Sequence, residues 1–316
     1  MVEVSPLISV VIGCHHDGPL LAASLDSIAA QQEAPAWECL IVANGPCQAG
    51  ASLQQRLATD TRFRLLHSPH RGLTEALIHG CAQARSPFIA RLDAGDAMEP
   101  QRLQRQAEAL AADPAAVLAT STVQVCGPQW ELLWIDRGTG EPIDVPHHAS
   151  VLFRRDAYEA AGGYRSAFYY GQDWDLWYRL AERGRLLLLN TPLTRVRLQV
   201  DGLSSRHRRE QVAIARLSLA CQQARARGDS EQPLLEQAAL IRPAPATTHP
   251  TSCPVPWDGR RAEGAYFIAE ALRRNGDRRC RSYFREALQH GFWKPRIWLR
   301  TLQSLYLKNN NSPLVR

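Results

Sequence analysis

Short apolar runs alternate with stretches of helical spacing over the first 200 residues of the chain. Each run has the length of a buried strand, and turn or polar residues such as Gly13 follow it. The runs predict strands over residues 7–12, 37–43, 62–66 and 88–92. Apolar residues three and four positions apart predict helices around residues 20–29 and 73–81, and Pro100 opens another that reaches Leu110.

This order of elements predicts an α/β fold with a mainly parallel sheet and helices on both faces. In such sheets, ligands bind outside the carboxyl ends of the strands. Polar residues follow three of these ends: His15 after the first strand, Asn44 after the second and Asp93 after the fourth. The glycine-rich dinucleotide and P-loop motifs do not occur in the sequence, which excludes the usual forms of those two sites.

The pattern changes to helices alone after about residue 205. Helical spacing predicts one helix around residues 212–221 and three more around 265–269, 283–288 and 298–305, while the Pro- and Thr-rich segment 243–256 is typical of a linker. We therefore expect an α/β domain over residues 1–205 and a smaller all-α region over 206–316. The charge changes at the same place: residues 206–316 carry 20 Lys and Arg against nine acidic residues, although the whole chain has a net charge of only +6.

The composition narrows the class of protein. Of the 316 residues, 45% are hydrophobic and 22% are charged, which is ordinary for a soluble globular chain. No apolar stretch approaches the roughly 20 residues of a membrane-spanning helix, and the first residues do not have the pattern of a secretory leader. The eight cysteines include no C-x-x-C pair, which speaks against a zinc ribbon or a disulfide framework. We expect a cytoplasmic protein with reduced thiols.

Two carboxylates, Asp93 and Asp96, lie in the turn after the fourth predicted strand. Three positions apart in a turn that contains Gly95, they are able to converge on one Mg²⁺ or Mn²⁺ that also holds phosphate oxygens. The alternative is a solvated loop whose aspartate caps the next helix. The position at the carboxyl end of a strand favours the metal site.

A third carboxylate, Asp173, precedes the apolar stripe of Leu176, Trp177 and Leu180, which predicts a helix that begins at or just after Asp173. At that position the helix dipole keeps a carboxylate ionised. An ionised carboxylate beside the flat face of Trp174 is suited to accept a proton from a sugar hydroxyl. A helix-capping aspartate is the alternative.

A histidine pair, His147 and His148, leads into a further predicted strand that ends near Arg154. Two histidines without a third ligand at zinc spacing make a weak metal site. We expect them to contact substrate or to form a structural hydrogen bond.

Taken in order, these segments resemble glycosyltransferase family 2, the inverting nucleotide-sugar transferases with a GT-A fold. The likeness covers roughly residues 6–205. It rests on residues 6–12, 23–31, 37–45, 71–77, 89–96, 148–155, 162–165 and 172–177.

The resemblance implies a reaction and a set of residues for it. The reaction is the transfer of a hexose-like sugar from a nucleotide-sugar donor to a hydroxyl of a glycan or lipid-linked acceptor with inversion, in cell-surface polysaccharide synthesis and with Mg²⁺ or Mn²⁺ as cofactor. The implied residues are the catalytic base Asp173, the nucleotide-sugar contacts His15, Asn44, Arg71 and Asp93, the metal ligands Asp93 and Asp96, and the acceptor contacts His148, Arg154 and Trp174.

Several positions depart from the family pattern. Asn44, with Ala43, replaces the acidic pair of the nucleotide loop, Gly95 replaces the second acid of the D-x-D region, and Gln172 replaces the glutamate beside the base. A histidine near the end of the domain is replaced by Gln199. These changes leave open a catalytically inactive GT-A-fold scaffold, and a nucleotidyltransferase on a similar sheet is a further alternative. Metal-dependent binding of a nucleoside diphosphate separates the transferase from a scaffold that binds none.

The arginine-rich region 206–316 is expected to contact an anionic bilayer, where lipid-linked acceptors are found. The segment from His290 to Arg296 places aromatic residues beside cations, a mixture that suits the membrane interface. A solvated basic surface is the alternative. No nucleic-acid-binding motif accompanies the charge, so nucleic acid is not an expected partner. The expected location is the cytoplasm, at the inner face of the membrane.

Overall fold

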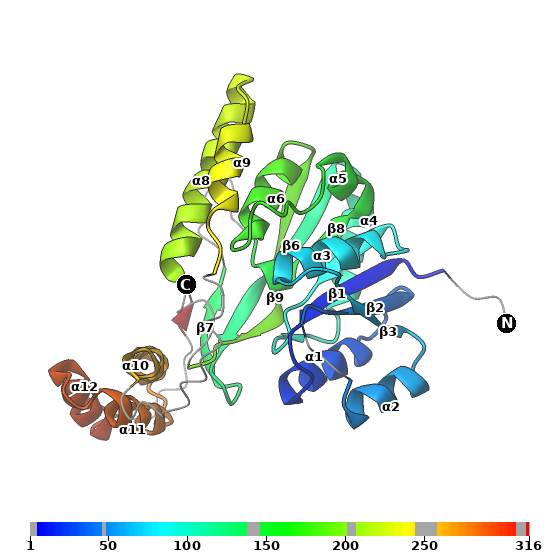
Figure 1. Cartoon of the computed structure of the whole chain (residues 1–316). Helices are drawn as coiled ribbons and strands as arrows, with labels where there is room; N and C mark the ends of the chain where they lie inside the picture. The colour runs from blue at the N-terminus through cyan, green and yellow to red at the C-terminus, as the bar shows by residue number, and fades with distance from the viewer. Residues whose placement is uncertain are drawn as a thin grey trace. The chain divides into compact units, whose positions relative to one another are not determined.

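The computed structural model describes residues 5–45, 49–137, 146–200, 207–243, 258–307 and 314–315 (Figure 1). The chain forms two compact units. The first comprises Met1–Val123, Arg137–Val196 and Glu210–Arg242, and the second comprises Gln124–Asp136, Arg197–Arg209 and Pro243–Arg316. This division groups residues 210–242 with the α/β part of the chain. The domain boundary near residue 205 stays a prediction, because a compact unit need not fold independently.

The first unit is built on a sheet whose strands are β1 (Ile8–Cys14), β2 (Trp37–Ala43), β3 (Phe63–His67), β4 (Phe88–Arg91), β5 (Ala97–Met98), β6 (Ala116–Cys126), β8 (Leu152–Arg154) and β9 (Arg185–Arg197). Six of them lie in the order β6-β8-β4-β1-β2-β3. Strands β4, β1, β2 and β3 are parallel neighbours, whereas β8 runs antiparallel to β4 and β6, and β5 runs antiparallel to β9. The predicted α/β fold with a mainly parallel sheet is confirmed, and the structure adds the antiparallel strands.

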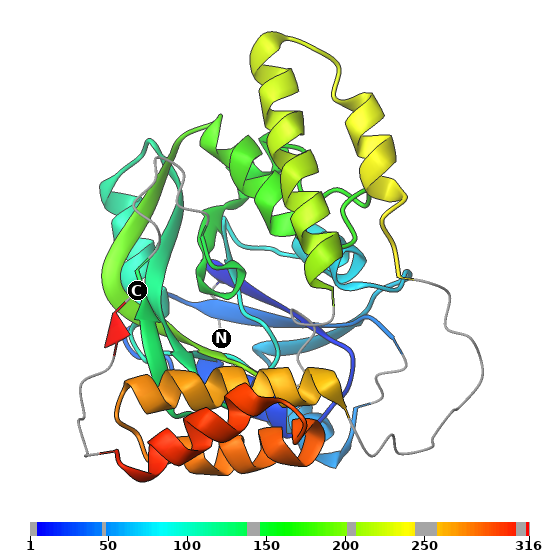
Figure 2. The same ribbon diagram turned by 90° about the vertical axis from the view of Figure 1, so that its left-hand side faces the viewer.

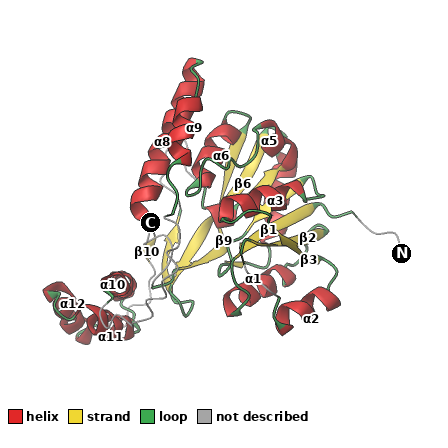
Figure 3. Cartoon of the chain, viewed as in Figure 1, coloured by secondary structure: helices red, strands yellow, loops and turns green. Residues whose placement is uncertain are grey.

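The helices of this unit cover both faces of the sheet (Figure 3). Side chains alternate between the faces of a strand, so Ile12 of β1 packs in one apolar cluster and Val11 in another. The first cluster takes residues of α1, α2 and α4, and the second takes residues of α3, α5 and α6. The helices are α1 (Pro19–Ala29), α2 (Ala51–Thr59), α3 (Leu73–Ala82), α4 (Arg102–Ala112), α5 (Arg155–Ala160), α6 (Gln172–Ala181), α8 (Arg208–Arg227) and α9 (Gln232–Ala239), with a short 3₁₀ helix η1 (His148–Ser150).

Helices α8 and α9 are joined to the α/β unit by a chain of ion pairs. Arg225 of α8 pairs with Glu182 at 2.8 Å and with Glu231 at 2.6 Å, and Glu231 also pairs with Arg165 at 2.7 Å. Behind them, Phe168, Ile214 of α8 and Ala238 of α9 form a small apolar core. Part of the basic charge of region 206–316 is therefore used inside the first unit.

In its described part, the second unit contains the helices α10 (Gly259–Arg274), α11 (Cys280–Gly291) and α12 (Pro295–Leu305), which lie side by side in orange to red in Figure 2. It also contains the parallel strand pair β7 (Leu132–Asp136) and β10 (Leu314–Val315). The carboxylate of Asp258 caps α10 by accepting bonds from the backbone N–H groups of Arg260 and Arg261. The predicted C-terminal helical region is confirmed. The predicted linker over 243–256 lies, apart from Pro243, outside the described residues.

Two further expectations concern membranes and cysteines. Within the described ranges, no helix is both long and apolar enough to cross a bilayer. Six of the eight cysteines lie in the described part of the chain, and all six are buried. They contribute to the core as small apolar side chains.

A close backbone approach at Gly264 of α10 yields a stability prediction. A Cβ added at Gly264 of α10 would lie 1.9 Å from the carbonyl oxygen of Val200, so one of the two segments must move. We expect Gly264→Ala to lower the free energy of unfolding by about 1–3 kcal/mol, measured by thermal unfolding. Gly259→Ala in the same helix is the matched control, because nothing lies within 4 Å of its added Cβ. Equal stability of the two variants would contradict this packing.

Candidate functional site at the carboxyl ends of the strands

The carboxyl ends of β1 and β2 place His15 and Asn44 side by side. The parallel register pairs Cys14 with Ala43, the residues directly before them. The Nδ1 atom of His15 lies 3.1 Å from Oδ1 of Asn44, in hydrogen-bond contact at an exposed position. The polar residues predicted at the carboxyl ends of the first two strands are therefore in contact.

The acidic loop after β4 is held by polar side chains of α1 and of the residues just after it. Gly95 donates its backbone N–H to the hydroxyl of Ser24 at 2.9 Å, and that hydroxyl donates to the backbone oxygen of Asp96 at 2.7 Å. Further along, Ser27 accepts the N–H of Met98 at 3.1 Å, and Gln31 donates to the oxygen of Glu99 at 2.8 Å. In the sequence, the segment 23–31 was noted only because it resembles the family's first helix. The structure shows that its polar side chains hold the acidic loop in place.

Two buried arginines fix the backbone around this loop. Arg102 of α4 donates to the oxygens of Arg91 at 2.8 Å, Ala149 at 2.7 Å and Val151 at 3.1 Å. Arg91, which is also buried, donates to the oxygens of Val11 and Leu92 and to the carboxylate of Asp93. Burial lowers the pKa of Arg102 to about 9, and the charge of Arg91 acts in the same direction. The end of β4 and the segment before β8 are thereby held together.

Asp93 is an accessible carboxylate beside a buried cation. Its side chain is 39% exposed, while that of Arg91 is 1% exposed. Partial burial acts to raise the pKa of Asp93, but the charge and hydrogen bond of Arg91 outweigh it and hold that pKa below its usual range. Asp93 therefore stays ionised at neutral pH.

Asp96 and Gly95 are less suited than Asp93 to bind a metal ion, because the first is buried and the second has no side chain. Asp96 is 7% exposed, and its backbone N–H is bonded to the oxygen of Asp93 at 3.0 Å. Gly95 has a φ of 110°, a left-handed conformation that favours glycine, so the missing acid of the D-x-D region has a backbone cause. Across the described part of the chain, no group of three His, Cys, Asp or Glu side chains is arranged to hold a metal ion.

Asp173 is the second residue of α6, at the helix start that the sequence predicted. Burial raises its pKa to about 6, and the neighbouring charge of Asp93 acts in the same direction. The hydrogen bonds from the backbone N–H groups of Asp173 and Trp174 act to lower the pKa but do not outweigh burial. The helix start alone therefore does not set this pKa, because desolvation is the larger effect.

His148 lies among aromatic side chains, and the charge of Asp93 influences its pKa. Its Nε2 is 3.0 Å from the hydroxyl of Tyr164, and its ring centroid is 6.1 Å from that of Trp177. Burial, aided by the charge of Arg91, lowers the pKa of His148 to about 3, so the imidazole is neutral at physiological pH. Charges on Asp173, Asp93 and Arg91 also influence the pKa of Tyr164, which burial raises.

The remaining predicted residues are placed differently. Trp174 is half-buried as the third residue of α6, and Arg71 is exposed just before α3. Arg154 points into structural contacts: its guanidinium donates to the oxygens of Ala116 at 2.8 Å and Leu110 at 2.6 Å. The structure therefore brings Asp93, His148 and Asp173 together around Arg91 and does not bring Arg154 to them; the acceptor role of Arg154 stays a prediction.

Sequence reasoning did not single out Arg91, Arg102 or Tyr164. Arg91 is the last residue of the otherwise apolar strand β4, and a charged residue at a buried strand position was the available signal. Nothing in the local sequence pattern distinguishes Arg102 from other polar residues of an amphipathic helix. Tyr164 is positioned by tertiary contact alone.

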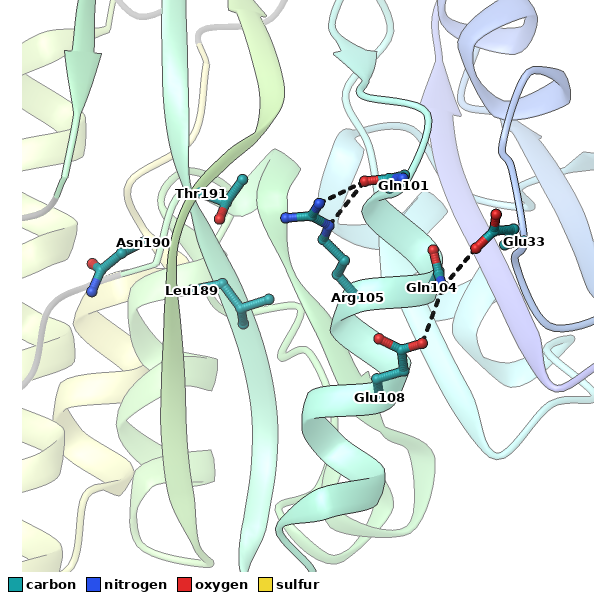
Figure 4. A pocket seen from close by; sticks show the side chains of 8 residues that line it. All are labelled: Glu33, Gln101, Gln104, Arg105, Glu108, Leu189, Asn190 and Thr191. Atoms are coloured by element: carbon teal, nitrogen blue, oxygen red, sulfur yellow. Dashed lines mark hydrogen bonds between the residues drawn. The ribbon is translucent and has the colours of Figure 1, made fainter.

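A polar pocket lies elsewhere in the first unit, between α4 and β9 (Figure 4). Its side chains bond mainly to one another: Gln104 donates to Glu33 and Glu108 at 3.1 Å each, and Arg105 donates to Gln101. None of the predicted site residues lines it. Because the polar side chains from Glu33 and from residues 101–108 bond to one another, we do not place the chemistry in this pocket.

The backbone at Gly95 gives a prediction about the D-x-D region. Gly95→Asp restores the acid that the family pattern has there, but it forces a φ near 110° on a residue with a Cβ. We expect a loss of about 1–3 kcal/mol in the free energy of unfolding. Gly18→Asp is the charge-matched control, since Gly18 has an extended φ of 171° and an open surrounding. A stable Gly95→Asp protein with stronger Mn²⁺ binding would show that the glycine is not required by the backbone.

The sequence is similar to a known family and to known proteins. The family model of glycosyl transferase family 2 matches residues 9–163. The putative glycosyltransferase EpsE of Bacillus subtilis is 27% identical over 222 residues, which cover 64% of this chain and 76% of that protein.

Two solved structures share the fold. The mannosyltransferase PcManGT from Pyrobaculum calidifontis in complex with GDP-Man and Mn²⁺ superposes with a TM-score of 0.52 and 16% identity, over 96% of this chain and 85% of that one. TarS of S. aureus in complex with UDP gives a TM-score of 0.52 and 11% identity, over 94% of this chain and 88% of that one. Residues 9–163 of this chain match glycosyl transferase family 2, and the chain has a GT-A fold.

Proposed function

We propose that this chain transfers a sugar from a nucleotide-sugar donor to a hydroxyl of a glycan or lipid-linked acceptor, with inversion at the anomeric carbon. The match to the family supports glycosyl transfer as the class of reaction. The observation that carries the finer proposal is a pair of carboxylates, Asp93 in the loop after β4 and Asp173 in the first turn of α6. Asp93 has a lowered pKa and Asp173 a raised pKa near 6. Two acids held at different pKa values in one place are suited to different tasks.

The donor side of the proposal uses the ends of β1, β2 and β4. His15 and Asn44 form an exposed polar pair that suits contacts with a base or ribose. Arg71 adds an exposed cation before α3, suited to a diphosphate. Two solved proteins of the same fold are in complex with GDP-Man and with UDP, which supports a nucleotide sugar as donor.

The side chains of this site supply only part of the ligand shell of a divalent cation, Mg²⁺ or Mn²⁺. Asp93 offers an exposed, ionised carboxylate, and Asp96 is the second candidate although it is mostly buried. Mg²⁺ sites of this kind rely on one or two carboxylates, with substrate phosphates and water completing the shell. When bound, the ion would neutralise charge on the departing nucleoside diphosphate. The Mn²⁺ in the complex of the Pyrobaculum enzyme supports this assignment.

Asp173 acts as the base. Its carboxylate accepts the proton of the acceptor hydroxyl while that oxygen bonds to the anomeric carbon and the bond to the diphosphate oxygen breaks. A single displacement from the opposite face inverts the configuration. With a pKa near 6, Asp173 is mostly ionised at neutral pH and is a stronger base than an exposed aspartate.

The acceptor side is formed by aromatic and neutral polar groups. His148 is neutral and lies against Tyr164, which suits hydrogen bonds to sugar hydroxyls without adding charge near the base. Trp174, beside Asp173 in α6, offers a flat face for a sugar ring. We assign the reaction to cell-surface polysaccharide synthesis on the cytoplasmic side of the membrane.

A catalytically inactive scaffold of the same fold is the second candidate. It is favoured by Gly95, Gln172 and Gln199, which replace an acid, a glutamate and a histidine of the family pattern. A scaffold of this kind could bind nucleotide without turnover.

The first prediction for this function concerns catalysis by Asp173. Asp173→Asn keeps the size of the side chain but removes the proton acceptor. We expect the rate of nucleoside diphosphate release from the donor in the presence of acceptor to fall by about 10² or more, with donor binding unchanged. In the active wild type, the acid limb of the pH–rate profile should have its midpoint near pH 6. Turnover of Asp173→Asn close to wild type would place the base elsewhere.

The second prediction concerns stability against pH. Because the pKa of Asp173 is raised in the folded protein, the folded state binds more protons than the unfolded chain between pH 3.8 and about 6. Stability contributed by this group is therefore lost as the pH rises through that window. We expect Asp173→Asn to raise the free energy of unfolding by roughly 1–3 kcal/mol at pH 8 and by little at pH 4. A variant less stable than wild type at pH 8 would contradict the buried-carboxylate assignment.

The third prediction concerns the metal. Mn²⁺ together with UDP or GDP should raise the melting temperature of the wild type above the effect of nucleotide alone. Asp93→Asn and Asp96→Ala should lose the Mn²⁺-dependent part, while Asp229→Asn, an exposed aspartate paired with Arg227, should keep it. If EDTA changes neither binding nor activity of the wild type, the metal assignment is wrong.

A further inference from the structure

Helix α12 and the residue after it expose a continuous apolar surface. Five large side chains form it, and each is between 50% and 87% exposed: Trp298, Leu299, Leu302, Leu305 and Tyr306. We call this set the α12 face. Just before the helix, Phe292 and Trp293 are also 49% exposed. A cluster of large exposed apolar residues of this kind marks an interaction site in a folded protein.

The exposure does not follow from the packing of the helix. Residues 298, 302 and 305, and residues 299, 302 and 306, recur at three- and four-residue spacing, so all five lie on one side of α12. The opposite side, which packs against the rest of the second unit, contributes Ile297 and Ser304. An amphipathic helix normally turns its apolar side to the core. Here the more apolar side points to the solvent.

The charges around α12 are mainly positive. After Glu286 the chain contains no acidic residue, and it contains five basic ones. Glu263 is shared between Lys294 and Arg296. Glu270 is shared among three arginines, Arg273, Arg274 and Arg300, at 2.7, 3.1 and 3.9 Å. Two carboxylates facing five cations leave a positive excess beside the apolar surface.

We propose that the α12 face docks on a lipid bilayer that carries anionic headgroups. A helix that lies in the membrane interface presents leucines and aromatic rings to the acyl boundary and keeps cations at headgroup level. The positive excess beside the α12 face is complementary to anionic lipid. In a symmetric dimer formed through the α12 face, the positive charges of one copy would lie opposite those of the other copy. These like charges would repel each other.

This proposal changes the membrane contact expected from charge alone. Arginines of α8, such as Arg225, are paired inside the first unit, so region 206–316 is not uniformly available as a basic surface. The α12 face combines apolar area with charge, and both favour the bilayer. The proposal is independent of the transferase chemistry, although a lipid-linked acceptor would benefit from it.

Co-sedimentation of the full chain with vesicles tests the proposal. We expect binding to phosphatidylcholine vesicles that contain phosphatidylglycerol, about tenfold weaker binding to phosphatidylcholine alone, and a decrease with rising salt. Full-length protein that stays in the supernatant with anionic vesicles at low salt would overturn the proposal.

A variant and its control locate the contact. Leu299→Gln, Leu302→Gln and Leu305→Gln combined should weaken vesicle binding by about tenfold or more and leave the melting temperature near wild type, because all three side chains are exposed. Leu240→Gln, an 84% exposed leucine after α9, is the matched control and should bind like wild type.

Unchanged vesicle binding by the triple variant would overturn the proposal. So would a wild-type dimer that ignores vesicles and becomes a monomer in the triple variant, since a second copy would then occupy the face. Nucleoside diphosphate binding, measured on the same proteins, reports on the proposed function separately.

Discussion

The burial of Arg102 is the constraint on which the candidate site depends. A guanidinium without solvent needs a hydrogen-bond acceptor for each N–H group, or the cost of desolvation is not offset. Arg102 donates four such bonds, to the carbonyl oxygens of Arg91, Ala149 and Val151 and to the side chain of Gln106, so most of its N–H groups have an acceptor. Those carbonyls belong to the end of β4 and to the segment that enters β8. The hydrogen bonds of Arg102 therefore hold in place the two chain segments that carry Asp93 and His148.

The electrostatics of the site follow from that arrangement. Arg91, held beside Arg102, places its own cation against Asp93 and keeps that carboxylate ionised. The same charge, together with burial, keeps His148 neutral. For Asp173 the charge of Arg91 is a weaker influence than burial, and the pKa of that carboxyl rises. The charge of Arg91 beside Asp93 and the burial of Asp173 thus give the two acids different pKa values, one below its usual range and one near 6, as the proposed displacement requires.

The order of strands and helices could be predicted because β1 and β2 are buried along their whole length and read as continuous apolar runs. Strands β6 and β9 escaped prediction: β6 contains Thr120, Ser121 and Thr122, and β9 is long and only partly buried. The sequence identified Asp93 and Asp173, since each follows or begins an element with a clear pattern. It did not give the pKa of Asp173 or the structural use of Arg154, because both depend on contacts between residues distant in the chain.

The central claim is that the carboxyl ends of β1, β2 and β4 form the donor site. A crystal structure of the protein with UDP or GDP and Mn²⁺ tests it directly. The account predicts the nucleotide next to His15 and Asn44, its diphosphate at Asp93, and the carboxylate of Asp173 facing the position of the sugar. A nucleotide bound elsewhere, for example in the pocket between α4 and β9, would contradict the account.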